Sequence, residues 1–268
     1  MTQPPAEPLS STRPSRKTPT TWTSPISSSN PASPSGAGVI DTLDERLQQV
    51  RAGIADAVRL AGRDPSEITT VVVTKFHPAS LIAQLAALGV TDVGESRHQE
   101  AQGKAAELAD LNLTWHFIGQ IQGKKARQVR AYANVIHSLD RASLVTALAA
   151  PDAPGTDAPV RDCFIQVNLT DDPARGGAQP SDLEALAEQV LATSGLRLLG
   201  LMAVAPREGE PRRAFAAVRA LSVSLRSIAP QATALSIGMS QDYQAAISEG
   251  ATHLRIGTAI TGIRPLHG

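Results

Sequence analysis

Lys75 is the residue whose position in this sequence most suggests covalent chemistry. It follows three valines and a threonine at positions 71–74 and comes three residues before Pro78. Such a run is typical of a buried strand in a parallel sheet, and ligands of these sheets bind at the carboxyl ends of the strands. A lysine held there against apolar walls is biased toward its neutral form, the nucleophile that forms Schiff bases. The alternative is a surface lysine that carries its charge into water.

Two later stretches place glycines and hydroxyl groups where a predicted strand ends and a helix begins. They are residues 236–242, Ser-Ile-Gly-Met-Ser-Gln-Asp, and residues 255–260, Arg-Ile-Gly-Thr-Ala-Ile. Backbone N–H groups at a helix start bind phosphate, and barrels often bind phosphate after their seventh and eighth strands. The alternative is ordinary turn chemistry, with Ser240 as a helix N-cap. As a pair opposite the strand-end lysine, the stretches predict a phosphate site formed by Ser236, Gly238, Met239, Ser240, Gly257 and Thr258.

A lysine and a phosphate site together indicate a phosphorylated aldehyde, and pyridoxal 5′-phosphate (PLP) fits this description. Its aldehyde would bind Lys75, and its phosphate would bind the amides of the two turns. Arg255 is then the candidate partner of the pyridine nitrogen. Because arginine keeps its charge in proteins, it can only donate a hydrogen bond to an unprotonated ring nitrogen. The ring would be a weak electron sink, which disfavours the full range of PLP reactions.

The elements that must position these residues follow a regular alternation. Eight strand-like runs occur near residues 71–75, 90–94, 114–118, 134–138, 162–168, 197–202, 232–236 and 252–256, and a helix-length segment separates each from the next. A further helix is predicted over 41–62, where Thr42 and Glu45 form a capping box. The alternation over residues 39–268 predicts a single (β/α)₈ barrel of the TIM type. An open doubly wound sheet is the alternative, but the glycine fingerprint usual after its first strand is missing.

Residues 1–38 have a different composition, with 8 Pro, 9 Ser and 6 Thr. A segment of this kind buries too little apolar surface to become ordered, so we expect a disordered tail. Balanced charge, with 25 basic and 25 acidic residues, argues against a nucleic-acid partner. The single cysteine, Cys163, excludes an internal disulfide and is expected in the core. No apolar run reaches the roughly 18 residues of a membrane span, so the cytosol is the simplest compartment.

Several motifs in the same order resemble the pyridoxal phosphate homeostasis protein family over roughly residues 40–266. They are Val72-Val73-Thr74-Lys75, Gly94-Glu95-Ser96-Arg97, Trp115-His116-Phe117-Ile118-Gly119-Gln120, His137-Ser138-Leu139-Asp140, Gly200-Leu201-Met202-Ala203, Leu235-Ser236-Ile237-Gly238-Met239-Ser240 and Leu254-Arg255-Ile256-Gly257-Thr258-Ala259. The chain differs from the family at Ser96 and Arg97, where the family usually has asparagine and tyrosine.

The resemblance implies a barrel like the N-terminal domain of alanine racemase, known as PLP fold type III. It implies PLP on Lys75 as an internal aldimine, phosphate contacts from the residues of the two turns, and Arg255 beside the pyridine nitrogen. It also implies a carrier or regulator of PLP supply without established catalytic turnover. Apo-enzymes that require PLP are then candidate partners, no nucleic-acid or membrane partner is expected, and the protein would be a monomer or a weak dimer.

Two alternatives remain open at the level of sequence. A racemase needs an acid or base on each face of the bound substrate, and alanine racemases take the second group from a tyrosine in an additional domain. The two tyrosines of this chain are Tyr132, predicted inside a helix, and Tyr243, predicted on a helix surface after the seventh strand. The second alternative is an aldolase in which Lys75 attacks a sugar phosphate without a cofactor.

Overall fold

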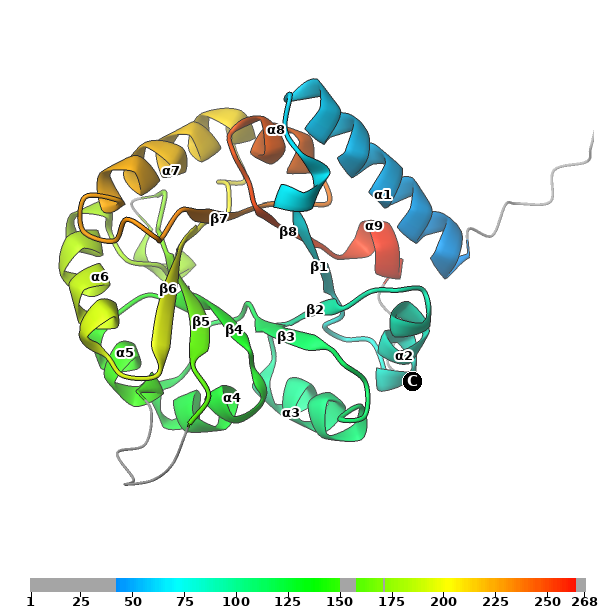
Figure 1. Cartoon of the computed structure of the whole chain (residues 1–268), viewed down its shortest axis with the longest axis horizontal. Helices are drawn as coiled ribbons and strands as arrows, with labels where there is room; N and C mark the ends of the chain where they lie inside the picture. The colour runs from blue at the N-terminus through cyan, green and yellow to red at the C-terminus, as the bar shows by residue number, and fades with distance from the viewer. Residues whose placement is uncertain (1–41, 150–157, 171, 264–268) are drawn as a thin grey trace, which may run out of the picture. The chain divides into compact units, whose positions relative to one another are not determined.

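The chain forms a closed barrel of eight parallel strands in the order β1 to β8, with helices around the outside (Figure 1). The computed structural model describes residues 42–149, 158–170 and 172–263, so the predicted tail at 1–38 lies outside the described residues. The strands are β1 (Thr69–Val73), β2 (Asp92–Glu95), β3 (Thr114–Phe117), β4 (Val135–Leu139), β5 (Arg161–Gln166), β6 (Leu196–Met202), β7 (Ala234–Met239) and β8 (His253–Ile256). The predicted fold class is therefore confirmed, and all eight predicted strands are present.

The helices also occur where the apolar periodicity predicts them. They are α1 (Leu43–Leu60), α2 (Ala79–Ala87), α3 (His98–Glu107), α4 (Ala126–Tyr132), α5 (Ala142–Leu148), α6 (Leu183–Ala192), α7 (Pro211–Leu225), α8 (Tyr243–Ser248) and α9 (Thr258–Thr261). The capping box at Thr42 and Glu45 is present, and it satisfies amide hydrogens that a helix start would leave unpaired. The alternative interpretation of Ser240 as a helix N-cap is wrong, because β7 continues to Met239 and Asp242 is the N-cap of α8.

Closure of the barrel makes β1 and β8 neighbours, and this changes the expected placement of the lysine. Val72 pairs with Ile256, so the strand that precedes Lys75 lies directly beside the strand that precedes the Gly257 turn. The sequence interpretation had the lysine opposite the phosphate turns, whereas the closed ring places β7, β8 and β1 side by side. The three segments therefore form one continuous part of the barrel mouth.

The hydrophobic core lies mainly between the barrel and its helices, where parallel strands bury both faces. Leu47, Ile54 and Val58 of α1 are buried in this layer. Cys163 is buried in β5, and burial raises the pKa of its thiol to about 12, which confirms the expected core cysteine. Across the described ranges, no helix is long and apolar enough to cross a bilayer.

Candidate functional site

Lys75 lies in the loop between β1 and α2, two residues beyond the end of the strand, and its side chain is exposed. The expectation of an amine enclosed by apolar walls is therefore not met. The next residue, Phe76, has a φ of 70°, a left-handed conformation that is uncommon for a bulky residue. Its amide donates to the Glu100 carboxylate across 3.1 Å, and the Arg97 guanidinium lies over its ring, 5.3 Å from the centroid. The start of α3 thus fixes the backbone next to the lysine.

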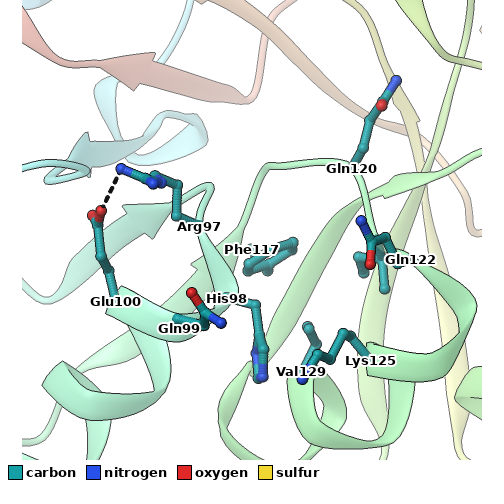
Figure 2. A pocket seen from close by; sticks show the side chains of 10 residues that line it. Arg97, His98, Gln99, Glu100, Phe117, Gln120, Gln122, Lys125 and Val129 are labelled. Atoms are coloured by element: carbon teal, nitrogen blue, oxygen red, sulfur yellow. Dashed lines mark ion pairs between the residues drawn. The ribbon is translucent and has the colours of Figure 1, made fainter.

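Arg97 and Glu100 also line a cavity of about 350 Å³ between α3 and the segment that leads into α4 (Figure 2). The two side chains form an ion pair of 2.8 Å at one edge of this cavity. Phe117 forms part of the lining, and amide side chains such as Gln120 and Gln122 surround it. The two residues of the ion pair therefore line the cavity and also contact Phe76, the residue next to Lys75.

The turns after β7 and β8 contact each other directly. The Gly257 amide donates to Ser240 Oγ at 3.3 Å, and Gly257 is the residue that precedes α9. Within the part of the chain that the structure describes, the amide hydrogens of Ser240, Thr258 and Ala259 donate to no protein acceptor. A hydroxyl group and three unpaired amides lie on two adjacent turns, and this is the donor set that a phosphate requires. The residues present therefore fit the phosphate of PLP.

Gly238 and Met239 have structural roles in the same turn. Gly238 has a φ of 93°, and a side chain there would meet Ala246 and Leu254. The glycine thus allows α8 to pack closely against β7 and β8. The Met239 amide donates to the Asp242 carboxylate at 2.6 Å. As cofactor contacts, both residues remain predictions.

Arg255 is buried inside the barrel, where it contacts β7 and the residue that follows β6. Its Nη1 donates to the backbone oxygen and the hydroxyl of Ser236, and its Nη2 donates to the Ala203 carbonyl at 2.9 Å. Burial lowers the pKa of Arg255 to about 10, which leaves it a cation at neutral pH. A guanidinium has five N–H hydrogens, and these three bonds leave the Nε hydrogen and one Nη2 hydrogen free among the described contacts. A free donor in this position fits an unprotonated pyridine nitrogen.

Ser236 and two strand histidines form a chain of contacts across the barrel interior. The Ser236 hydroxyl is 2.8 Å from His137 Nδ1, His137 Nε2 is 2.9 Å from His116 Nδ1, and His116 Nε2 is 2.9 Å from the Asp92 carboxylate. The Ser236 side chain is therefore used inside the barrel, and its predicted contact with the cofactor phosphate remains untested. The two histidines lie within β3 and β4, below the mouth of the barrel.

A second buried polar group supports β1 from the outside of the barrel. Glu95, Lys104 and Thr74 join β2, α3 and the end of β1, with the Lys104 ammonium 2.7 Å from Glu95 and 3.1 Å from the Thr74 carbonyl. Thr74 also donates its hydroxyl to Glu95 at 2.8 Å. Burial raises the pKa of Glu95, and the hydrogen bond and charge of Lys104 oppose this rise. Thr74 is thus held from two sides immediately before Lys75.

The sequence did not single out Asp92, Lys104 or Phe76. For Asp92, the period of two along strands was an available signal, because Asp92 and Gly94 lie on the same face of β2 and Gly94 pairs with His116. The other two residues had no local signal. Lys104 resembles any helix lysine in the sequence, and the left-handed backbone of Phe76 depends on contacts with α3.

Comparison with known proteins identifies close relatives of this fold and sequence. The family described as alanine racemase, N-terminal domain, matches residues 45–265. The pyridoxal phosphate homeostasis protein of Pseudomonas aeruginosa is 41% identical over 84% of this chain and 97% of its own length. The Escherichia coli K12 protein of the same name is 38% identical over 84% of this chain and 98% of its own length.

Solved structures of related proteins have a similar fold. PipY of Synechococcus elongatus, solved with PLP bound, has a TM-score of 0.71 and 35% identity, covering 82% of this chain and all of that one. Alanine racemase of Corynebacterium glutamicum has a TM-score of 0.61 at 16% identity, covering 83% of this chain and 63% of the racemase. The second likeness shows the fold alone.

Proposed function

Because the chain belongs to the pyridoxal phosphate homeostasis protein family, we propose that it binds PLP at the mouth of its barrel and serves the intracellular supply of this cofactor. The observation that carries the proposal is the cluster of unpaired donors on the turns after β7 and β8, beside the strand that leads to Lys75. A related structure that contains PLP supports the same ligand.

In this proposal the Lys75 amine would hold PLP through its aldehyde, with loss of water. The amides of Ser240, Thr258 and Ala259 and the Ser240 hydroxyl would hold its phosphate. Arg255 donates a hydrogen bond to the pyridine nitrogen without giving up its proton. When bound, PLP supplies an electron-withdrawing ring, and the guanidinium leaves that ring unprotonated.

We further propose that the protein has no catalytic turnover of its own. A racemase requires a second acid or base across from the lysine. Tyr132 lies in α4 with its hydroxyl 3.4 Å from His98, and Tyr243 packs at the start of α8 close to Gly53 of α1. Neither tyrosine supplies that second group. An accessible Lys75 instead suits transfer of PLP to apo-enzymes, and the cytoplasm is the compartment expected for such a role.

The decisive experiment locates the covalent bond to PLP. Protein incubated with PLP is reduced with borohydride, digested and analysed by mass spectrometry, and we expect the pyridoxyl group on Lys75. Before reduction, a Schiff base absorbs near ~420 nm. Lys75→Ala is expected to lose this band and remain folded, whereas the matched control Lys124→Ala, another exposed lysine, should keep it.

Two results would overturn the proposal. A protein that stays colourless with excess PLP would favour a cofactor-free aldolase, and a pyridoxyl group on Lys124 would move the site. The absence of turnover is tested separately, by incubation of PLP-loaded protein with L-alanine in D₂O. Rapid exchange of the α-hydrogen with formation of D-alanine would identify a racemase.

A further inference from the structure

A line of five polar side chains crosses the barrel from its amino-terminal face to the proposed cofactor site. Asp92 begins β2 and is partly exposed, while His116, His137, Ser236 and Arg255 are buried. The contacts between successive members measure 2.9, 2.9, 2.8 and 2.7 Å. The line thus connects the start of β2 with the proposed cofactor site. The direction in which its hydrogen bonds donate determines how Arg255 is held.

The two ends of the line determine this direction. Arg255 can only donate, and an ionised Asp92 can only accept. If His116 Nε2 donates to Asp92, a neutral His116 must accept at Nδ1. His137 then donates from Nε2 and accepts at Nδ1 from the Ser236 hydroxyl. The Ser236 oxygen in turn accepts from Arg255. In this arrangement every hydrogen and every acceptor along the line is used once.

The reverse direction leaves a buried hydrogen unpaired. It requires a doubly protonated His116 that donates to both neighbours, so that Ser236 Oγ accepts from His137 and from Arg255 together. The Ser236 hydroxyl hydrogen would then have no acceptor among the described residues, in a side chain that is fully buried. It would also place a second cation in the interior with Arg255. Burial, together with the neighbouring charge of Arg255, lowers the pKa of His137 well below its usual value, which agrees with a neutral ring.

We propose that Asp92, His116, His137 and Ser236 form a one-directional hydrogen-bond relay that positions Arg255 for the cofactor. Asp92, His116 and His137 act as positioning residues, because each fixes its neighbour in the line, and Ser236 passes this constraint to Arg255. The relay keeps Nη1 of Arg255 turned toward Ser236, which leaves the Nε hydrogen and one Nη2 hydrogen for the pyridine nitrogen. This inference rests on the proposed binding of PLP, but the relay itself exists in the protein without ligand and can be tested there.

The first test determines where the ring hydrogens lie. In ligand-free protein labelled with ¹⁵N-histidine, we expect His116 and His137 to be neutral at pH 7, both with the hydrogen on Nε2. Protonation of either ring at Nδ1, or a doubly protonated His116, would overturn the assigned direction. Assignment of the signals uses the variants His116→Phe and His137→Phe.

The second test measures PLP affinity, and His253→Phe is the matched control. His253 lies among the same rings, 6.2 Å from His137 between ring centroids, but its Nδ1 contacts Thr252 outside the relay. We expect His137→Phe to weaken PLP binding about tenfold, because it leaves two buried groups unpaired. Asp92→Asn should weaken binding about threefold. An asparagine can donate as well as accept, so it no longer forces His116 to donate from Nε2. His253→Phe should stay within about twofold of the unmodified protein.

The possible outcomes separate the relay from the proposed function. If the unmodified protein forms no bond between PLP and Lys75, the proposed function fails while the histidine signals still decide the direction of the relay. If PLP binds normally and His137→Phe binds it with unchanged affinity and absorption, the positioning role is refuted. Should His137→Phe fail to fold, the partly exposed Asp92→Asn variant decides the same question, and unchanged affinity there also refutes the proposal.

Discussion

At the scale of the residue, the lysine itself was predictable from sequence, whereas the means by which it is held was not. A β-prone run that ends at a lysine is a local pattern, and local patterns can be read along one chain. The left-handed conformation of Phe76 depends on Glu100, which lies 24 positions further on. The pairing of His137 with Ser236 joins residues 99 positions apart. Contacts of this kind follow from closure of the ring and have no signal in the sequence around each residue.

The contact between Glu100 and Phe76 provides a prediction about the reactivity of Lys75. Left-handed backbone in a residue such as phenylalanine costs on the order of 1 kcal/mol or more and persists only where the surroundings maintain it. Glu100→Ala removes the acceptor for the Phe76 amide. We therefore expect the loop to lose this conformation and the apparent affinity for PLP to fall about fivefold. Titration of the absorbance near ~420 nm measures this affinity.

Glu107→Ala is the control for this experiment, because Glu107 ends the same helix and is exposed. The control separates loss of the specific contact from a general effect of removing a carboxylate from α3. Equal PLP affinity of Glu100→Ala and the unmodified protein would show that the conformation of Phe76 does not govern Lys75.

At the scale of the element, the order and type of the strands and helices followed from the sequence, but several boundaries did not. The alternation of apolar runs indicated eight strands, and the closed barrel contains all eight. β7 was expected to end at residue 236 and continues to Met239, because Gly238 adopts a positive φ and the register with β8 shifts there. Such irregularities depend on the neighbouring strand, so the Ser240 N-cap was placed wrongly.

The attachment of α3 to β1 and β2 provides a prediction about stability. Lys104→Met would leave the Glu95 carboxylate buried without its cation, and removal of one partner from a buried pair costs about 3 kcal/mol. We expect urea denaturation at pH 7 to show a loss of this size. Lys124→Met, at an exposed lysine, should change the free energy of unfolding by less than about 0.5 kcal/mol.

The pH dependence of this variant follows from the direction of the Glu95 shift. Burial raises the pKa of Glu95 above its ordinary 4.5, so the folded protein holds this proton more tightly than the unfolded chain does. The contribution of this proton on Glu95 to the free energy of unfolding is fully present below pH 4.5, and it is lost as the pH rises through the pKa of Glu95 in the folded protein. Without Lys104, the free energy of unfolding falls further as the pH rises, because no cation offsets the buried Glu95 carboxylate. The free energy of unfolding of Lys104→Met should therefore differ least from that of the unmodified protein near pH 4, where Glu95 is protonated. A deficit that is equal at pH 4 and pH 7 would contradict this account.

At the scale of the whole molecule, the barrel combines an apolar outer layer with an interior that contains several polar side chains. Apolar side chains fill the space between strands and helices, while imidazole rings, a hydroxyl and a guanidinium lie inside the ring. The outer layer stabilises the fold by burying apolar surface, whereas the polar groups of the interior stabilise it only when they are correctly paired. Its groups need exact hydrogen-bond partners and a fixed state of protonation, because a buried charge without a partner is costly.

This interior predicts a loss of stability in mild acid. Burial lowers the pKa of His253 from 6.5 to about 4, so the unfolded chain binds this proton more readily than the folded barrel does. For a histidine whose folded pKa is depressed, the stability is present above pH 6.5 and is lost as pH falls toward 4. The shift corresponds to about 3 kcal/mol for this residue.

His253→Phe removes the titrating group and should therefore flatten the pH dependence in this range. We expect the free energy of unfolding of the unmodified protein to fall by about 3 kcal/mol more than that of the variant between pH 6.5 and pH 4. Urea denaturation at several pH values measures both curves, and the comparison cancels the carboxylates that the two proteins share. Parallel curves would show that His253 keeps its ordinary pKa. Water or the neighbouring Asp92 would then stabilise its charge inside the ring, and the barrel interior would tolerate a second cation beside Arg255.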